Sequence, residues 1–247
     1  MIQDLHSHTY YSFCGKDTPE ELIEAAIAGG VEMLGICDHN YGIAFARKEF
    51  YKSEFDISNT NYELTLIRYF DHMTLLKEKY ADKIDIKRGI EVATTLKFPR
   101  MLLPNSTSLE IFDYALIEHI GDPDMSSVGR DLFSFVSLLG CPCGIAHTDI
   151  FGYINRLSED PMSYLKRMAE AGIFWELNVS YDSIHHYREH EYVKRFFESE
   201  REQELVRSSG LKLSVGFDSH RAEEYRPDRV KEACKKLEEL NIPLMFM

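Results

Sequence analysis

The stretch Ile2-Gln3-Asp4-Leu5-His6-Ser7-His8, followed by Thr18-Pro19-Glu20-Glu21 and then by Gly29-Gly30, predicts one β-strand joined to one α-helix. Its first apolar residues indicate a buried strand. The Thr is a helix-capping residue, the Pro occupies the first helical position, and the second Glu stands three residues after the cap. The two glycines mark the end of the helix. The chain therefore opens with a βα unit.

The same unit recurs along the chain. Seven short apolar runs predict buried strands. They are residues 2–5, 33–37, 84–91, 114–117, 143–146, 173–179 and 211–217. Stretches with the helical spacing of apolar residues lie between most of these runs. They are residues 62–80, 130–139, 162–171, 192–208 and 227–240.

Strands that alternate with helices predict parallel βαβ units. Seven such units, with strands that are apolar on both faces, favour a closed or nearly closed α/β barrel over an open doubly wound sheet. Residues 242–247 would form an eighth strand or a closing tail, whereas residues 41–60 and 94–108 give no clear prediction. The length of 247 residues, without a linker-like segment, predicts one domain over residues 1–247.

The composition argues against several classes of protein. Twenty-eight Lys and Arg against 41 Asp and Glu give a net charge of −13, which disfavours long nucleic acids as partners. No apolar run is long enough for a membrane span, and the first residues lack the features of a signal peptide. The five cysteines form no C-x-x-C pair. We therefore expect a cytoplasmic protein without a disulfide framework.

Histidines and acidic residues gather at the C-terminal ends of the predicted strands. Six of the ten histidines fall there, and they are His6, His8, His39, His119, His147 and His220. Asp38, Glu91 and Asp218 stand at or beside the same ends. Barrels keep their active sites on that face. Imidazole and carboxylate ligands with almost no thiolate suit Zn, Mn or Fe ions.

The His6-Ser7-His8 pair is the most specific local feature. Residues i and i+2 of a strand share a face, so both rings can reach one ion. A Glu can bridge two ions, which makes Glu91 the natural centre of a site with several ions. Two ions about 4 Å apart can hold a hydroxide between them and clamp a phosphoryl group during its transfer to water. Each motif alone has a simpler explanation, such as a turn or a core histidine, but their joint order favours a metal site.

These residues resemble the motifs of the PHP (polymerase and histidinol phosphatase) superfamily. In chain order they are Asp4-Leu5-His6-Ser7-His8-Thr9, Cys37-Asp38-His39, Gly89-Ile90-Glu91, residues 114–119, Ala146-His147 and Gly216-Phe217-Asp218-Ser219-His220. The resemblance implies a distorted (β/α)7 TIM-like barrel and a metal-dependent phosphoesterase. The helix before Gly89 and the stretch Glu176-Leu177-Asn178-Val179 are similar to the histidinol-phosphatase-like branch.

The resemblance also implies two or three divalent ions. One would be held by His6, His8, Glu91 and Asp218, and a second by Glu91, His119 and His147. A third would use His39 and His220 with one residue from the loop after His8. Members with three ions usually place a His or Asp in that loop, whereas this chain has Cys14 at about that position. A Cys thiolate could bind Zn²⁺, and Asp17 or a water could replace it.

We therefore expect a phosphomonoesterase in which a metal-bridging hydroxide attacks phosphorus in line. The candidates for proton transfer are Asp218, His220 and His39. Arginine suits the oxygens of a phosphate, so Arg156 and Arg221 are candidates for substrate binding. Asn178 could orient a substrate hydroxyl or amine. The expected partner is a small phosphate ester, and the oligomeric state stays open.

Three alternatives remain. A nucleotide phosphatase or phosphodiesterase would use the same site. An amidohydrolase barrel also begins with His-x-His on its first strand, but it typically adds a bridging Lys where this chain has Glu91. A non-catalytic barrel would retain metals for stability or act as an accessory domain.

Overall fold

Seven parallel strands form the centre of the computed structural model, which describes residues 1–44, 62–96, 109–180 and 190–247. The strands are β1 (Gln3–Asp4), β2 (Met33–Ile36), β3 (Asp85–Ala93), β4 (Tyr114–Glu118), β5 (Cys143–Ile145), β6 (Ile173–Asn178) and β7 (Leu213–Gly216). Each strand pairs with the next along the chain. The two outermost strands also meet, because the Leu5 N–H donates to the Val215 carbonyl over 2.8 Å. The sheet therefore closes into a nearly complete barrel, which confirms the predicted α/β fold.

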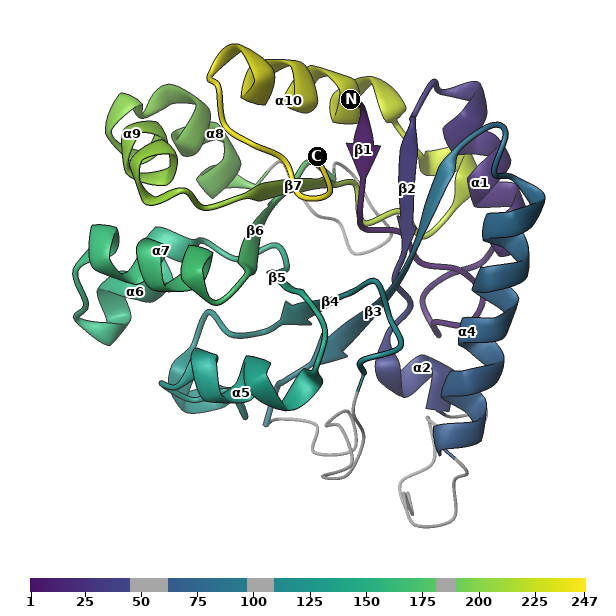
Figure 1. The fold of residues 1–247 in the computed structure, drawn as a ribbon, viewed down its shortest axis with the longest axis horizontal. Helices are drawn as coiled ribbons and strands as arrows, with labels where there is room; N and C mark the ends of the chain where they lie inside the picture. The colour runs from purple at the N-terminus through teal and green to yellow at the C-terminus, as the bar shows by residue number, and fades with distance from the viewer. Residues whose placement is uncertain (45–61, 97–108, 181–189) are drawn as a thin grey trace.

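Helices surround the barrel on its outside (Figure 1). They are α1 (Pro19–Ala28), α2 (Asn40–Ala44), α4 (Tyr62–Lys79), α5 (Leu132–Leu139), α6 (Ile150–Leu157), α7 (Pro161–Glu170), α8 (Glu191–Glu198), α9 (Glu200–Ser209) and α10 (Pro227–Glu239). The predicted capping box of α1 is present. The Thr18 side chain accepts from the Glu21 N–H, and the Glu21 carboxylate accepts from the Thr18 N–H. None of the helices in the described ranges combines the length and the hydropathy that a membrane span requires.

Two helical segments differ from the prediction. Residues 192–208 form two helices, α8 and α9, because Ser199 leaves the helical conformation and its side chain accepts from the Glu202 N–H at the start of α9. The sequence pattern did not predict α6. Four residues separate this short helix from the end of β5, and Asp149 is its capping residue.

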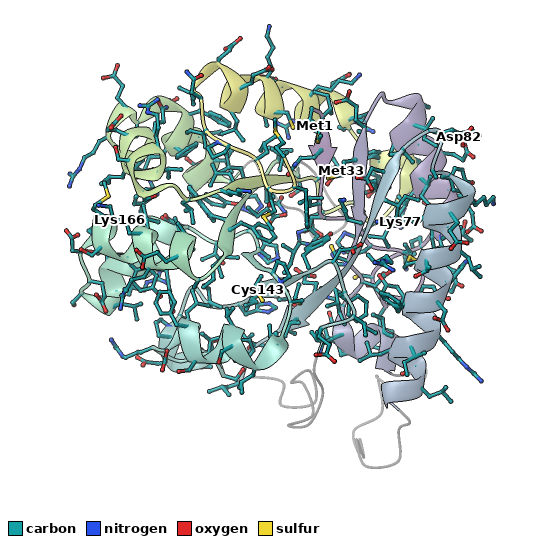
Figure 2. The ribbon with its side chains drawn as sticks, in the orientation of Figure 1. Met1, Met33, Lys77, Asp82, Cys143 and Lys166 are labelled. Atoms are coloured by element: carbon teal, nitrogen blue, oxygen red, sulfur yellow. The ribbon has the colours of Figure 1, made fainter. Side chains whose placement is uncertain are left out.

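Side chains of the strands alternate between two apolar regions. Outward side chains such as Ile36, Ile90 and Trp175 pack against the helices. Inward side chains form a smaller cluster inside the barrel. They are Leu5, Met33, Cys37, Tyr114, Leu116, Ala146 and Phe174. Charged side chains such as Asp82 and Lys166 lie at the outer rim (Figure 2).

The C-terminal tail covers the N-terminal ends of the strands. Leu244 forms an isolated parallel bridge with Leu213, and the Met245 N–H donates to the Leu213 carbonyl over 2.7 Å. The Gln3 side-chain amide donates to the Met245 carbonyl over 2.6 Å. Residues 242–247 are thus a closing tail rather than an eighth strand. The opposite end of the barrel is the end at which polar side chains gather.

Tyr114 fills the barrel interior and requires glycine on the neighbouring strands. Its hydroxyl donates to the Leu5 carbonyl over 2.5 Å. A Cβ atom at Gly35 or at Gly89 would overlap the Tyr114 side chain. The glycines of β2 and β3 are therefore needed for space at these two positions.

We predict that Gly89→Ala lowers the free energy of unfolding by about 1–3 kcal/mol, because the added methyl group overpacks the interior against a fixed ring. Equilibrium unfolding in urea measures this loss. Gly121→Ala is the control, since the nearest atom to a Cβ there is Arg156 Nη1 at 3.7 Å. Equal stability of the two variants would contradict this packing.

Candidate metal centre

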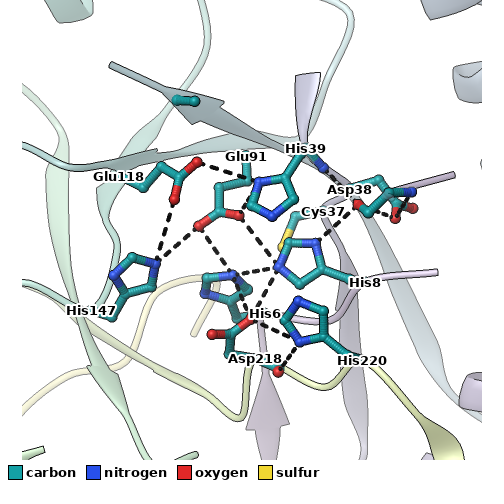
Figure 3. A network of polar contacts seen from close by, with 12 residues as sticks. His6, His8, Cys37, Asp38, His39, Glu91, Glu118, His147, Asp218 and His220 are labelled. Carbon is teal, nitrogen blue, oxygen red and sulfur yellow. Dashed lines mark hydrogen bonds and ion pairs between the residues drawn. The ribbon is translucent and has the colours of Figure 1, made fainter. Parts of the chain in front are cut away.

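Imidazoles and carboxylates, all buried except the partly buried His147, converge at the C-terminal ends of the strands (Figure 3). They are His6, His8, His39, Glu91, Glu118, His147, Asp218 and His220. Strand alternation explains much of this convergence. Cys37 faces the barrel interior, and His39 faces it two residues later. Tyr114 and Leu116 face the interior, and Glu118 continues their row.

The ligating atoms form four groups, and within each group all atoms lie within 4.8 Å of one another. The groups are His6–His8–Glu91, His6–His147–Asp218, His8–His39–His220 and His39–Glu91–Glu118. His6 Nε2 and His8 Nε2 are 3.0 Å apart. Ligand atoms about 2.0–2.1 Å from a tetrahedral ion are about 3.3 Å apart from one another. The spacing therefore matches that of ligands around an ion.

Glu91 lies at the centre of these groups. Its Oε1 atom is 3.3 Å from His6 Nε2 and 3.2 Å from His147 Nε2. Its Oε2 atom is 3.3 Å from His8 Nε2 and 2.8 Å from His39 Nδ1. Each carboxylate oxygen thus faces a different pair of imidazoles. This is the arrangement that a bridging carboxylate between two ions needs.

Glu176 orients two members of the centre from behind. Its Oε1 atom lies 2.6 Å from His6 Nδ1, and its Oε2 atom accepts from the His147 N–H over 2.6 Å. A proton held on His6 Nδ1 by this carboxylate leaves the Nε2 lone pair for an ion. Sequence reasoning assigned no role to Glu176. Strand alternation could have predicted it, because Glu176 lies two residues after the inward-facing Phe174 and therefore faces the same side.

Asp38 orients His8 through a serine. The Ser12 hydroxyl donates to Asp38 over 2.6 Å, and Thr9 donates to the same carboxylate from its N–H and its hydroxyl, each over 2.7 Å. Ser12 Oγ also lies 3.2 Å from His8 Nδ1 and accepts from the His39 N–H over 2.9 Å. Asp38 is therefore not a ligand. It fixes the loop after β1 and turns His8 Nε2 towards Glu91.

The backbone turns sharply at two residues of the centre, His147 and Asp218, and at His119 beside it. His119, His147 and Asp218 have φ angles of 65°, 25° and 56°. Non-glycine residues adopt such left-handed conformations at a cost, and they cluster at functional sites. At His147 the turn brings a residue that follows the inward-facing Ala146 into the centre.

Neighbouring charges shift the pKa values of these groups in both directions. Burial lowers the pKa of His147, but its hydrogen bond with Glu91 and the charges of Glu91, Asp218 and Glu176 together raise it more, to about 9. Burial also lowers the pKa of His6, but the charges of Glu176, Glu91 and Asp218 together raise it more, so this pKa lies well above its usual value. At His220 burial dominates and lowers the pKa to about 3. The carboxylates thus draw positive charge into the centre, carried by protons or by metal ions.

The donor set fits divalent metal ions. Imidazole and carboxylate ligands suit Zn, Mn or Fe. Glu118 Oε1 is buried and accepts no hydrogen bond from the residues that the structure describes. Cys37 lies beside the centre, but its thiol donates to the Leu5 carbonyl over 3.5 Å. The buried ligating atoms are thus nitrogen and oxygen.

His119 does not join the four groups, although the family pattern implied that it holds an ion. Its side chain is 46% exposed, and its Nδ1 atom lies 3.2 Å from Glu118 Oε2. Sequence reasoning missed Glu118, which occupies the inward position at the end of β4.

The loop after His8 contributes no side chain to the four groups of described residues. Cys14 is partly buried and belongs to none of these groups. Asp17 accepts from the Ala222 N–H over 2.6 Å. The structure instead brings His39 and His220 together with His8.

A cleft of about 430 Å³ opens beside the centre. Its walls include His119, Asp122, His147, Thr148 and Arg156. The Arg156 side chain forms no ion pair or hydrogen bond with any residue in the described ranges. Its guanidinium is therefore available to a ligand in the cleft.

The other two predicted substrate contacts lie elsewhere. Arg221 pairs with Glu223 and Glu224 over 3.4 and 3.5 Å. Asn178 is buried, and its amide donates to Glu176 Oε1 over 3.4 Å. Asn178 therefore supports the residue that orients His6.

Comparison with known proteins identifies the family. The model of the PHP domain family matches residues 4–243. This chain belongs to the PHP domain family. The resemblance inferred from the sequence motifs is thus confirmed, and the centre described above lies within the matched part of this PHP domain.

Relatives of this PHP domain include phosphatases. The curated histidinol-phosphatase of Lactococcus lactis subsp. lactis (strain IL1403) is 29% identical over 121 residues, which are 48% of this chain. The match spans only 40% of that relative's length.

Solved structures share the fold of this PHP domain. Histidinol phosphate phosphatase from Lactococcus lactis subsp. lactis Il1403, in complex with Zn, L-histidinol and phosphate, has a TM-score of 0.57 at 19% identity. That comparison covers 98% of this chain and 95% of the other. The structures of YwqE from Bacillus subtilis and CpsB from Streptococcus pneumoniae, described as metal-dependent tyrosine phosphatases, give a TM-score of 0.51 at 18% identity over 95% of this chain and 87% of the other.

We predict that Glu176→Gln weakens metal binding by about 10–100-fold, because an amide cannot serve both His6 Nδ1 and the His147 N–H as an acceptor. Competition with a chromogenic chelator measures the affinity. Glu170→Gln, an exposed change on α7, is the matched control. Unchanged affinity in both variants would rule out this orienting role.

Proposed function

We propose that this PHP domain is a phosphomonoesterase that uses two or three divalent ions of Zn, Mn or Fe. The observation that carries the proposal is the buried centre around Glu91, which adjoins a cleft with an arginine available to a ligand. The histidinol-phosphatase relative supports the same reaction class. The fold shared with zinc-bound histidinol phosphate phosphatase is consistent with it.

The four groups of ligating atoms are the places where ions would be held. His6, His8 and Glu91 would hold one ion. Glu91 would also contribute to a second ion together with His39, whose Nδ1 atom faces Glu91 Oε2. Bound ions would activate the attacking water and neutralise charge on the phosphoryl oxygens. Glu176 and Asp38 would keep the ligand lone pairs aimed at the ions.

Arg156 would bind the phosphate ester from the cleft side. A guanidinium presents a planar fork of donors that matches phosphate oxygens. Asp218, His39 and His220, expected to move a proton, lie within the ligand groups. We therefore assign them first to holding ions.

The cleft suits a small ester. Its volume of about 430 Å³ is that of a pocket for a ligand of drug size or smaller. The net charge of −13 disfavours long nucleic acids. L-histidinol phosphate is the first candidate substrate, because the curated relative is a histidinol-phosphatase. Sugar phosphates and mononucleotides are the next.

Phosphate release tests the proposal. The chain is reconstituted with Mn²⁺, Zn²⁺ or Fe²⁺ and offered L-histidinol phosphate, sugar phosphates, mononucleotides and a phosphodiester. Preference for histidinol phosphate supports the specific substrate, and preference for another monoester supports only the reaction class. Hydrolysis of the diester alone would favour a phosphodiesterase. Bound metal without turnover of any ester would favour a non-catalytic barrel.

We predict that Arg156→Ala raises KM for the best ester by about 10–100-fold, because a charge-assisted hydrogen bond to phosphate is lost. Arg156→Lys should recover part of the loss, since it restores the charge without the fork. Steady-state kinetics with a constant metal content measures both. Arg201→Ala, an exposed change on α9, is the control. An unchanged KM in Arg156→Ala would remove this residue from the substrate site.

A further inference from the structure

The end of β4 presents two neighbouring residues that can each bind a metal, and the barrel admits one of them. Tyr114, Leu116 and Glu118 form one inward row, so Glu118 occupies the position nearest the ligand groups. The corresponding inward residue before His147 is Ala146. A methyl group leaves room for the next ring to turn inward, whereas the Glu118 side chain fills that room.

Glu118 makes the contacts expected of a ligand. It is only 4% exposed. Its Oε1 atom lies 3.4 Å from His39 Nδ1, and its Oε2 atom lies 4.0 Å from His147 Nε2. It shares a group with His39 and Glu91. A buried carboxylate oxygen without a hydrogen-bond donor among the described residues carries a large desolvation cost, which a cation relieves.

His119 faces the opposite way. Its ring lines the cleft together with His147 and Arg156. His119 Nδ1 lies 3.2 Å from Glu118 Oε2. This contact fixes the imidazole so that the edge carrying Nε2 faces the cleft. Nearly half of the side chain is exposed. A ring in this place can meet a ligand in the cleft.

We propose that β4 supplies Glu118 as the metal ligand and that His119 binds substrate in the cleft. The assignment of His119 rests on the proposed phosphomonoesterase function, whereas the assignment of Glu118 does not. A carboxylate in place of an imidazole makes the donor set of the His39–Glu91–Glu118 group harder and more negative. Such a set shifts preference towards Mn²⁺.

Metal counting separates the two residues. The full chain and its Glu118→Gln and His119→Asn variants are loaded with Mn²⁺ or Zn²⁺, desalted and measured for metal per chain, with thermal unfolding as the check of folding. We expect Glu118→Gln to bind fewer ions and to lose affinity by about tenfold or more. We expect His119→Asn to keep the metal content of the unchanged chain. Metal loss in His119→Asn, or unchanged metal in Glu118→Gln, would overturn the assignment.

Kinetics tests the other half. In His119→Asn, KM for the best ester should rise by about tenfold at unchanged metal content, because one contact to the substrate is lost. If no ester is hydrolysed, the proposed function fails, and calorimetric binding of inorganic phosphate to the metal-loaded chain replaces KM. Unchanged KM, or unchanged phosphate binding, would overturn the role of His119. The metal count decides Glu118 in either case.

Discussion

The carboxylate of Glu91 is fully buried at one end of a closed barrel, and its negative charge has to be balanced there. A buried charge without a partner is costly, so the surrounding structure must supply cations or donors. Imidazoles that follow the ends of β1, β2 and β5 meet the two oxygens of Glu91 from different sides. The rest of the centre depends on this arrangement, which holds nitrogen and oxygen donors at the spacing of metal ligands.

A second layer keeps the donors in place. Glu176 contacts His6 and the backbone of His147, and Asp38 acts on His8 through Ser12. The tail at the other end of the barrel and the Tyr114 ring fill the interior. The apolar half of the barrel thus supports the polar half. This support stabilises the unfavourable left-handed backbone conformations of His147 and Asp218.

The parallel α/β barrel and most residues of the centre were predictable from sequence, because apolar runs and strand-end histidines are local signals. Residues whose role depends on the face of the strand that they occupy were harder to predict. Glu118 and Glu176 continue the inward rows of Leu116 and Phe174. The neighbouring His119 was predicted as a ligand in place of Glu118, because the family pattern implied that it holds an ion. The ion pairs of Arg221 with two glutamates could not be predicted from the sequence either, since they depend on the conformation of the turn after β7.

The most direct test of the account removes the central carboxylate. We would measure metal content and phosphate release together in Glu91→Ala and in the isosteric Glu91→Gln, with thermal unfolding to establish that each variant is folded. The account predicts that both variants lose bound metal and activity together, since Glu91 faces all the ligand pairs around it. A folded variant that is fully active without metal would contradict it.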